Sequence, residues 1–219
     1  MDIGANIGIY SFLMATQKKA RKVFAFEPEP RSRYCLESTV KTNGLNNLHV
    51  SPLGVSSQEQ SQASFFVSAK NHGGHSLDPN SILSESDAVA GKISIGLTTL
   101  DTFLRENNEL QPDLIKVDAQ QHENQILLGA AKTLSEARPI IDLECFRQDM
   151  TTLLPHFYNK NYRAYKAKSN LEFAVENEEW KAGFPEGSEH ANVLFFPIEK
   201  REQVFAAVKR SRHQKFEDH

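Results

Sequence analysis

The stretch Asp2–Gly8, DIGANIG, decides the fold of this 219-residue chain. Gly4 and Gly8 remove side chains where the backbone must turn tightly and a ligand can approach. A helix is expected to begin near Ile7, so that its first amides can bind a carboxylate or phosphate. The G-x-x-x-G spacing, with no Gly-Lys-Ser/Thr after it, fits dinucleotide-binding and P-loop sites poorly. For the loop alone, the alternative is that the glycines only form a turn before the helix and bind no ligand.

An acidic residue, Glu27, ends the next predicted strand, in the segment FAFEPEP. In nucleotide-binding α/β folds, an acid at this place accepts hydrogen bonds from the ribose hydroxyls of a bound nucleoside. The alternative is a solvated acid before a proline turn, and the glycine loop upstream favours ribose binding. Glu29 is expected to face solvent. Asp2, at the end of the first strand, is expected to accept hydrogen bonds from a ligand amine.

Strand and helix patterns alternate along most of the chain. The apolar runs KVFAF, PDLIKVD and RPIIDLE are typical of strands buried on both faces, while RSRYCLESTVKTN and HENQILLGAAKTLSEA each predict one helix. Single helices between strands imply parallel crossovers. Towards the C-terminus, YRAYKA, LEFAVE and NVLFFP predict an antiparallel edge. The expected fold is α/β and Rossmann-like: an open, mostly parallel sheet with helices on both faces.

A less regular region lies between the third predicted strand and the TTLDTF helix. Pro52 weakens the strand NLHVSPLGV. ASFFVSA and KISIGL read as strands, and the polar segment NHGGHSLDPNSILSESD between them reads as a long loop. Loops of this length in compact domains are often binding loops.

Composition gives broad limits on function. The formal net charge of −3 offers no general electrostatic reason to bind nucleic acid or an anionic membrane. The length suits one domain, residues 1–219, and no apolar run reaches the roughly 20 residues that span a bilayer. We expect a cytoplasmic protein with no nucleic-acid partner; composition does not indicate an oligomeric state.

Seven motifs in order resemble one known family. DIGANIGIYS, VFAFEPEP, NGLNN, TTLDTF, LIKVDAQQHE, ILLGA and RPIIDLE follow the order of the FkbM family of S-adenosylmethionine-dependent methyltransferases. The resemblance covers about Asp2 to Glu144. It implies a class I methyltransferase fold with a seven-stranded sheet. It also implies O-methylation of a hydroxyl on a small-molecule, glycan or lipid acceptor, such as a sugar, a lipid or a secondary metabolite.

The resemblance also implies which residues bind the cofactor. The segment Gly54–Ser57 matches the place where adenine is usually held, and Ser56 is its candidate contact. Asp118 matches the acid that faces the methionine end of the cofactor and the acceptor. The matching cofactor-loop and ribose residues are Asp2, Gly4, Asn6, Gly8 and Glu27.

Asp118, His122 and Glu123 form a candidate catalytic cluster. As a group beside the cofactor they could deprotonate a hydroxyl or coordinate a divalent ion, although no ligand spacing supports a metal site. Glu123 has a structural alternative, because an acid is favoured at a helix N-terminus. His122 alone would be an ordinary histidine. The family usually has glycine where this chain has Gln121, and a positive φ there would cost about 1 kcal/mol.

Three further residues are candidates for acceptor binding. His72 and His75, in NHGGHSL, are expected on a substrate-side loop, with a solvated loop as the alternative. Two histidines three apart can bind a metal, but no cysteine or third ligand supports a structural zinc site. Glu144 either faces the acceptor or is an ordinary strand-end acid.

The first strand is unusually short. Class I methyltransferases place this strand at the centre of the sheet, and here only Met1 to Ile3 precede the glycine loop. Each missing buried side chain would cost about 1.5–3 kcal/mol. We therefore expect a domain truncated at its first strand, unless another segment fills the gap. The alternative function is a non-catalytic nucleoside-binding or interaction module that kept the fold.

Overall fold

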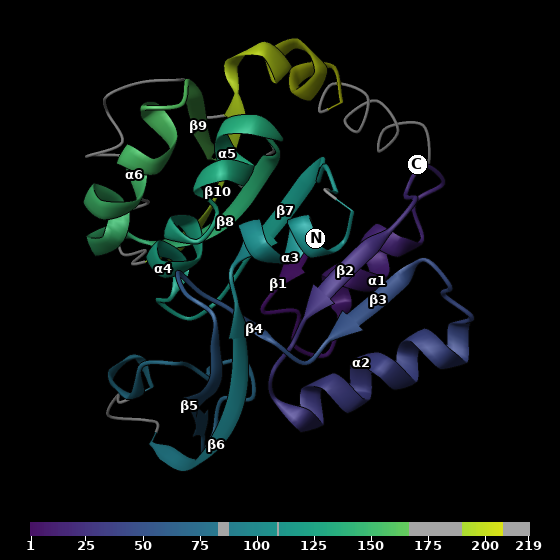
Figure 1. Ribbon diagram of the computed structural model, residues 1–219, viewed down its shortest axis with the longest axis vertical. Coiled ribbons are helices and arrows are strands. Elements are labelled where there is room, and N and C mark those ends of the chain that lie inside the picture. The colour runs from purple at the N-terminus through teal and green to yellow at the C-terminus, as the bar shows by residue number, and fades with distance from the viewer. Residues whose placement is uncertain (83–87, 109, 167–189, 208–219) are drawn as a thin grey trace, which may run out of the picture.

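A seven-stranded sheet forms the centre of the computed structural model, which describes residues 1–82, 88–108, 110–166 and 190–207 (Figure 1). The strand order is β3-β2-β1-β7-β8-β10-β9. Pairs from β3 to β8 are parallel, and β10 is antiparallel to β8 and β9. The expected parallel sheet with an antiparallel edge is confirmed; the predicted strand LEFAVE lies outside the described residues. The strands are β1 (Asp2–Ile3), β2 (Val23–Phe26), β3 (Leu48–Ser51), β7 (Leu114–Val117), β8 (Ile140–Phe146), β9 (Tyr162–Lys166) and β10 (His190–Pro197).

An interior place in the sheet, between β2 and β7, is occupied by β1, although it has only two residues. Asp2 pairs with Ala25 on one side and Lys116 on the other. The Met1 ammonium also donates to the Leu114 carbonyl at 2.7 Å. The short strand is therefore bonded along both edges, and no other described segment pairs between β2 and β7. Strand order reverses here, and ligands of open α/β sheets bind at such a switch point.

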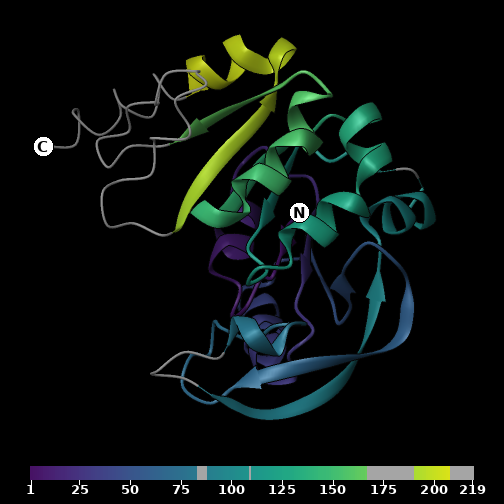
Figure 2. The ribbon, with the colours of Figure 1, turned by 90° about the vertical axis from the view of Figure 1, so that its left-hand side faces the viewer.

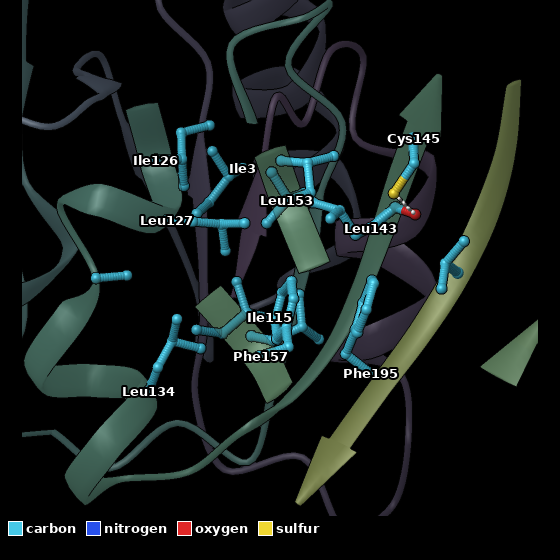
Figure 3. Close-up of a cluster of buried hydrophobic side chains, with 14 of the residues drawn as sticks. Ile3, Ile115, Ile126, Leu127, Leu134, Leu143, Cys145, Leu153, Phe157 and Phe195 are labelled. Atoms are coloured by element: carbon cyan, nitrogen blue, oxygen red, sulfur yellow. Dashed lines mark hydrogen bonds between the residues drawn. The ribbon is translucent and has the colours of Figure 1, made fainter. Parts of the chain in front are cut away.

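Helices cover both faces of the sheet, as expected (Figures 1 and 2). On β2, Val23 and Ala25 join a core cluster with residues of α1 and α2, while Phe26 points into the larger cluster on the opposite face. Figure 3 shows that larger cluster, where Ile115 and Leu143 of the strands meet helix residues. The helices are α1 (Ile9–Ala15), α2 (Pro30–Asn43), η1 (Pro79–Ser81), α3 (Leu100–Glu106), α4 (Glu123–Leu128), α5 (Ala131–Glu136), η2 (Arg147–Asp149), α6 (Met150–Tyr158) and η4 (Ile198–Lys200).

The start of α2 corrects one expectation. Glu29 does not face solvent: it is buried, and its carboxylate accepts a hydrogen bond from the Ser32 amide at 2.7 Å as the N-cap. Pro30 follows at the first helical position, where its missing N–H costs nothing. The acid is held by the helix it begins, so solvent exposure could not be judged from its position before a proline turn.

The single helix predicted from HENQILLGAAKTLSEA is wrong: two helices, α4 and α5, form instead. Gly129 separates them, and a Cβ there would overlap the carbonyl oxygen of Ser56. The start of α5 is capped from outside, because the Asp101 carboxylate accepts from the amides of Lys132 and Thr133, each at 2.8 Å. Close packing against Ser56 therefore breaks an otherwise continuous helical pattern.

A second sheet arises where Pro52 ends β3. Its strands are β4 (Gly54–Val55), β5 (Gln60–Ser68) and β6 (Val89–Thr98), in the order β4-β6-β5. The expected strands ASFFVSA and KISIGL are confirmed as the antiparallel pair β5 and β6. Figure 1 shows this pair extending away from the main sheet. Phe66 and Ser76 form an isolated bridge, so the loop after β5 folds back onto it.

Two further features concern the chain as a whole. Among the described residues, no helix combines the length and apolarity needed to cross a membrane. Both cysteines, Cys35 and Cys145, are free thiols.

Candidate functional site

A cavity of about 290 Å³ opens at the carboxyl ends of the central strands. It lies at the switch point between β1 and β7, where a ligand site was expected. Its lining combines main-sheet residues with residues of the β5–β6 pair and the loop after β5. The polar residues in the lining are Asn6, Glu27, Ser32, Asn71, His72, His75, Asp118, Gln120, His122 and Glu144.

The glycine loop brings two backbone segments together at the cavity wall. Gly4 has φ 77°, and a Cβ on it would overlap the carbonyl oxygen of Asp118. The amide of Gly4 donates to the Phe26 carbonyl at 3.1 Å, which ties the loop to β2. Gly8 plays a different part: the described lining does not include it, and its bare Cα makes room for Leu36 of α2.

Glu27 lies in the cavity wall next to the glycine loop. Its Oε2 accepts from the Asn6 amide at 2.7 Å, and its Oε1 accepts from the Glu29 amide at 2.8 Å. Burial raises the pKa of Glu27 to about 7, against the opposing effect of these two hydrogen bonds. Each carboxylate oxygen has a second lone pair. The side chain is thus fixed in orientation and can still accept hydrogen bonds from a ligand diol.

Asp2 lies below the loop rather than in the described lining. It is 1% exposed, and its Oδ2 accepts from the Ser11 hydroxyl at 2.6 Å. Its Oδ1 is buried without a partner among the described residues. Burial raises the pKa of Asp2 above the ordinary value. The geometry gives Asp2 a role in holding α1 against β1, and no direct contact with the cavity.

The expected adenine segment reaches the cavity through Gly54 and Val55. Ser56 is buried, and its Oγ lies 3.0 Å from His122 Nε2, outside the described lining. The apolar wall at this end comes instead from Phe65 and Ile95 of the second sheet, joined by Leu53, Leu77 and Ile126. Sequence reasoning missed these side chains. The only sequence pattern that could have indicated them is the alternation of apolar residues in β5 and β6. That pattern predicts which residues share a face of the sheet, but not that this face lines a cavity.

Asp118 follows β7, Glu144 lies within the neighbouring parallel strand β8, and both line the cavity. Asp118 Oδ2 accepts from the Lys116 ammonium at 2.9 Å. Burial acts to raise the pKa of Asp118, but a hydrogen bond from Glu144 and the charge of Lys116 outweigh it and lower the pKa. Burial and the contact with Asp118 raise the pKa of Glu144 to about 8. Burial and the charge of Asp118 therefore favour the protonated form of Glu144, while Lys116 favours the ionised form of Asp118.

The three residues of the predicted catalytic cluster have different positions. Asp118 and His122 line the cavity, and Glu123 is outside the described lining. Glu123 is 3% exposed, and its carboxylate accepts from the Ala119 amide at 3.0 Å, with its pKa raised by burial to about 7. This contact favours the structural alternative for Glu123. Burial lowers the pKa of His122, so the ring is neutral at pH 7.

The turn between Asp118 and α4 is left-handed at two glutamines. Gln120 has φ 50° and Gln121 has φ 69°, so Gln121 adopts the positive φ that favours the glycine usual in the family. The Gln120 carbonyl accepts from the Ser76 hydroxyl at 3.0 Å. This hydrogen bond ties the turn to the loop after β5, so the strained backbone is held from outside.

His72 and His75 both line the cavity. His75 Nδ1 accepts from the Ser68 amide at 3.0 Å. A neutral ring with an occupied Nδ1 carries its proton on Nε2, so it cannot accept a proton at Nδ1. The carbonyl of His72 accepts from Asn6 Nδ2 at 3.4 Å, which links the loop to the glycine turn. No three His, Cys, Asp or Glu residues in the described part of the chain are placed to hold a metal ion.

Comparison with known proteins identifies the family. The sequence model of the Methyltransferase FkbM domain matches residues 2–184. The chain belongs to the FkbM methyltransferase family. A crystal structure of the FkbM methyltransferase from Methylobacillus flagellatus KT superimposes with a TM-score of 0.55 at 16% identity. The match covers 89% of this chain and 42% of that one, so the chain spans under half of that relative's length. The shared fold is that of class I methyltransferases.

Two other matches are weaker. A tRNA U34 carboxymethyltransferase from Desulfotalea psychrophila is 43% identical over 54 residues, which is 25% of this chain and 17% of the relative. The structure of TYW2 from M. jannaschii in complex with AdoMet is 15% identical, with a TM-score of 0.42, over 90% of this chain and 68% of that one.

Proposed function

We propose that this FkbM-family methyltransferase uses S-adenosylmethionine to methylate a hydroxyl oxygen on a sugar, lipid or secondary metabolite. The observation that carries the proposal is the position of Glu27 in the cavity wall beside Gly4. A carboxylate fixed by two backbone amides at the end of the second strand is suited to both hydroxyls of a ribose.

The rest of the cavity also fits an adenosyl cofactor. At one end, Phe65, Ile95 and Leu77 offer apolar surface for a purine. Near the other end, the Gly4 turn packs against the Asp118 backbone, and both residues line the cavity. When bound, the cofactor supplies a methyl group on a positively charged sulfur, which is a strong electrophile. The residues expected to hold it are Gly4, Asn6, Glu27 and Asp118, with the apolar wall.

The chain must also orient the acceptor and take up its proton. Asp118 is ionised and lines the cavity, so its carboxylate can accept the hydroxyl proton. His122 is neutral and lines the cavity, which makes it a second candidate for the same task. Positioning supplies the remainder of the rate enhancement.

Isothermal titration with S-adenosylhomocysteine tests the cofactor part. We expect binding to the unmodified chain and a loss of at least tenfold in affinity for Glu27→Gln, because the amide presents one acceptor oxygen instead of two. Glu37→Gln is the matched control, since Glu37 is an exposed glutamate on α2 and should change nothing. Absence of binding, or equal affinity in both variants, would remove the basis of the proposal.

A screen with methyl-labelled S-adenosylmethionine tests the transfer itself. Pools of glycans, lipids and small hydroxyl-bearing metabolites should show label in at least one pool. Binding of the cofactor with no transfer to any pool would favour the alternative, a nucleoside-binding module that kept the fold. The strained Gln121 turn is the observation that keeps this alternative in view.

A further inference from the structure

Lys116 is a buried lysine in the middle of the sheet. It is 3% exposed and belongs to β7, whose residues Ile115 and Val117 point into the larger core on the other face. Lys116 therefore points to the face that carries α1, where its Nζ lies 4.5 Å from the centre of the Tyr10 ring. A buried ammonium requires partners, because its loss of hydration is costly.

Its partners come from three adjacent strands. In the sheet register, Lys116 is paired with Asp2 of β1 on one side and Asp142 of β8 on the other. Side chains of paired residues in parallel strands lie on the same face. Two residues further along, Asp118 and Glu144 follow on that face at the cavity. Four carboxyl groups thus surround this ammonium: Asp2, Asp118, Asp142 and Glu144.

One ammonium cannot keep four carboxyl groups ionised in a buried site. The direct hydrogen bond of Lys116 goes to Asp118, at 2.9 Å. The pKa values of Asp2, Asp142 and Glu144 are all raised, chiefly by burial, while that of Asp118 is lowered. Two other charged groups act on these carboxyls: the Met1 ammonium beside Asp2, with its pKa lowered by burial to about 6, and Glu123, which opposes ionisation of Glu144.

We propose that Lys116 is a positioning residue for methyl transfer: its ammonium assigns the negative charge to Asp118, while Glu144 keeps the proton and hydrogen-bonds to Asp118. The proposal rests on the proposed function. In the step concerned, the acceptor O–H bond breaks and the proton binds an oxygen of Asp118. The acceptor oxygen uses the freed electron pair for its new bond to the methyl carbon, whose bond to sulfur breaks with that electron pair left on sulfur. Lys116 touches neither acceptor nor cofactor in this scheme and acts through Asp118.

A purely structural lysine would explain the burial but not the choice of partner. Lys116 could be satisfied by Asp2 or Asp142, which lie beside it in the register, yet its hydrogen bond reaches forward to the cavity. The two explanations differ in what removal of the ammonium does. A structural role changes stability alone, whereas the proposed role changes where Asp118 and Glu144 titrate.

Carbon-13 NMR of the labelled Asp and Glu carboxyl groups provides the test, with Asp118→Asn and Glu144→Gln to assign the two signals. In the unmodified protein, Glu144 should titrate near pH 8 and Asp118 below 3.8. Lys116→Met should raise the titration of Asp118 by one unit or more. Asp142→Asn is the matched control. It removes a carboxyl group that faces Lys116 from β8 but keeps the ammonium, so Asp118 should titrate at the same pH as in the unmodified protein.

Two further readouts separate this proposal from the proposed function. Lys116→Met should bind S-adenosylhomocysteine within about threefold of the unmodified affinity. As the pH is lowered, its rate of methyl transfer to the responsive acceptor pool should begin to fall at a higher pH than the rate of the unmodified protein. No cofactor binding by the unmodified chain would end the proposed function. Unmoved titration of Asp118 in Lys116→Met, with cofactor binding intact, would overturn the role of Lys116 alone. If Lys116→Met does not fold, the titration of Glu144→Gln is the deciding measurement. The proposal places the proton on Glu144, so a carboxyl signal that still titrates near pH 8 in Glu144→Gln would contradict it.

Discussion

Gly4 lies against Asp118 so closely that the backbone carbonyl of Asp118 occupies the place of a Gly4 side chain. This contact joins the two halves of the candidate site, because Gly4 follows β1 and Asp118 follows β7. The Asp118 amide in turn donates to the Ile3 carbonyl at 3.0 Å. The glycine therefore allows the close approach of the segments that follow β1 and β7.

Gly4→Ala should abolish binding of S-adenosylhomocysteine and lower the free energy of unfolding by at least about 2 kcal/mol, since the methyl group overlaps backbone and φ is 77°. Titration calorimetry and urea unfolding measure the two effects. Gly91→Ala is the matched control, because a Cβ there meets nothing within 4 Å. Equal behaviour of the two variants would show that the close approach is not needed.

Gln121→Gly should stabilise the chain by about 1 kcal/mol, because glycine adopts the φ of 69° at this position without strain. The midpoint of urea unfolding should rise with an unchanged slope. Gln62→Gly, in β5 with no positive φ, should instead destabilise by a similar amount. A destabilised Gln121→Gly would mean that the glutamine side chain contributes more than the strain costs.

Much of the main sheet could be predicted from local patterns. The buried strands ending at Glu27 and Asp118 were recognisable as continuous apolar runs, and parallel crossovers then placed their ends at one edge. Glu27, Asp118 and Glu144 consequently line the cavity together. The position of the site followed from the order of the strands.

Non-local packing decided what could not be predicted. Gly129 divides a continuous helical pattern because Ser56 lies against it, and this contact joins segments far apart in the chain. Asp2 and Glu123 were chosen for their type and position, yet their hydrogen bonds to Ser11 and Ala119 hold them away from the described cavity lining. Lys116 passed unnoticed because a lysine inside an apolar run gives no sign of the carboxylates on neighbouring strands.

Phe65→Ala should weaken binding of S-adenosylhomocysteine by about tenfold, because an aromatic face under a purine contributes about 1–3 kcal/mol. Phe65 is buried in the cavity wall and Phe66 follows it on the opposite face of β5, outside the described lining. Phe66→Ala is therefore the control and should bind normally. Ser56→Ala should also retain affinity, whereas a large loss would restore Ser56 as an adenine contact.

The stability of the chain should be highest near pH 5 and fall towards pH 8. Burial raises the pKa of Glu27 and Glu123 to about 7 and that of Glu144 to about 8, from 4.5 in an exposed glutamate. Between pH 4.5 and 8 the native state therefore binds more protons than the unfolded state, and the free energy of unfolding falls as pH rises. Asp118 and Glu29 have lowered pKa values, so stability is also lost below about pH 4.5.

Urea unfolding at half-unit steps from pH 4 to pH 9 measures this profile. Glu123→Gln should reduce the slope between pH 5 and 8, because its amide oxygen can still accept from Ala119 while the titrating group is gone. Glu37→Gln, an exposed glutamate, should keep the full slope. A free energy of unfolding that rises steadily from pH 5 to pH 8 would contradict the burial of protonated carboxyls at this site, since ionised and paired carboxylates give that opposite sign.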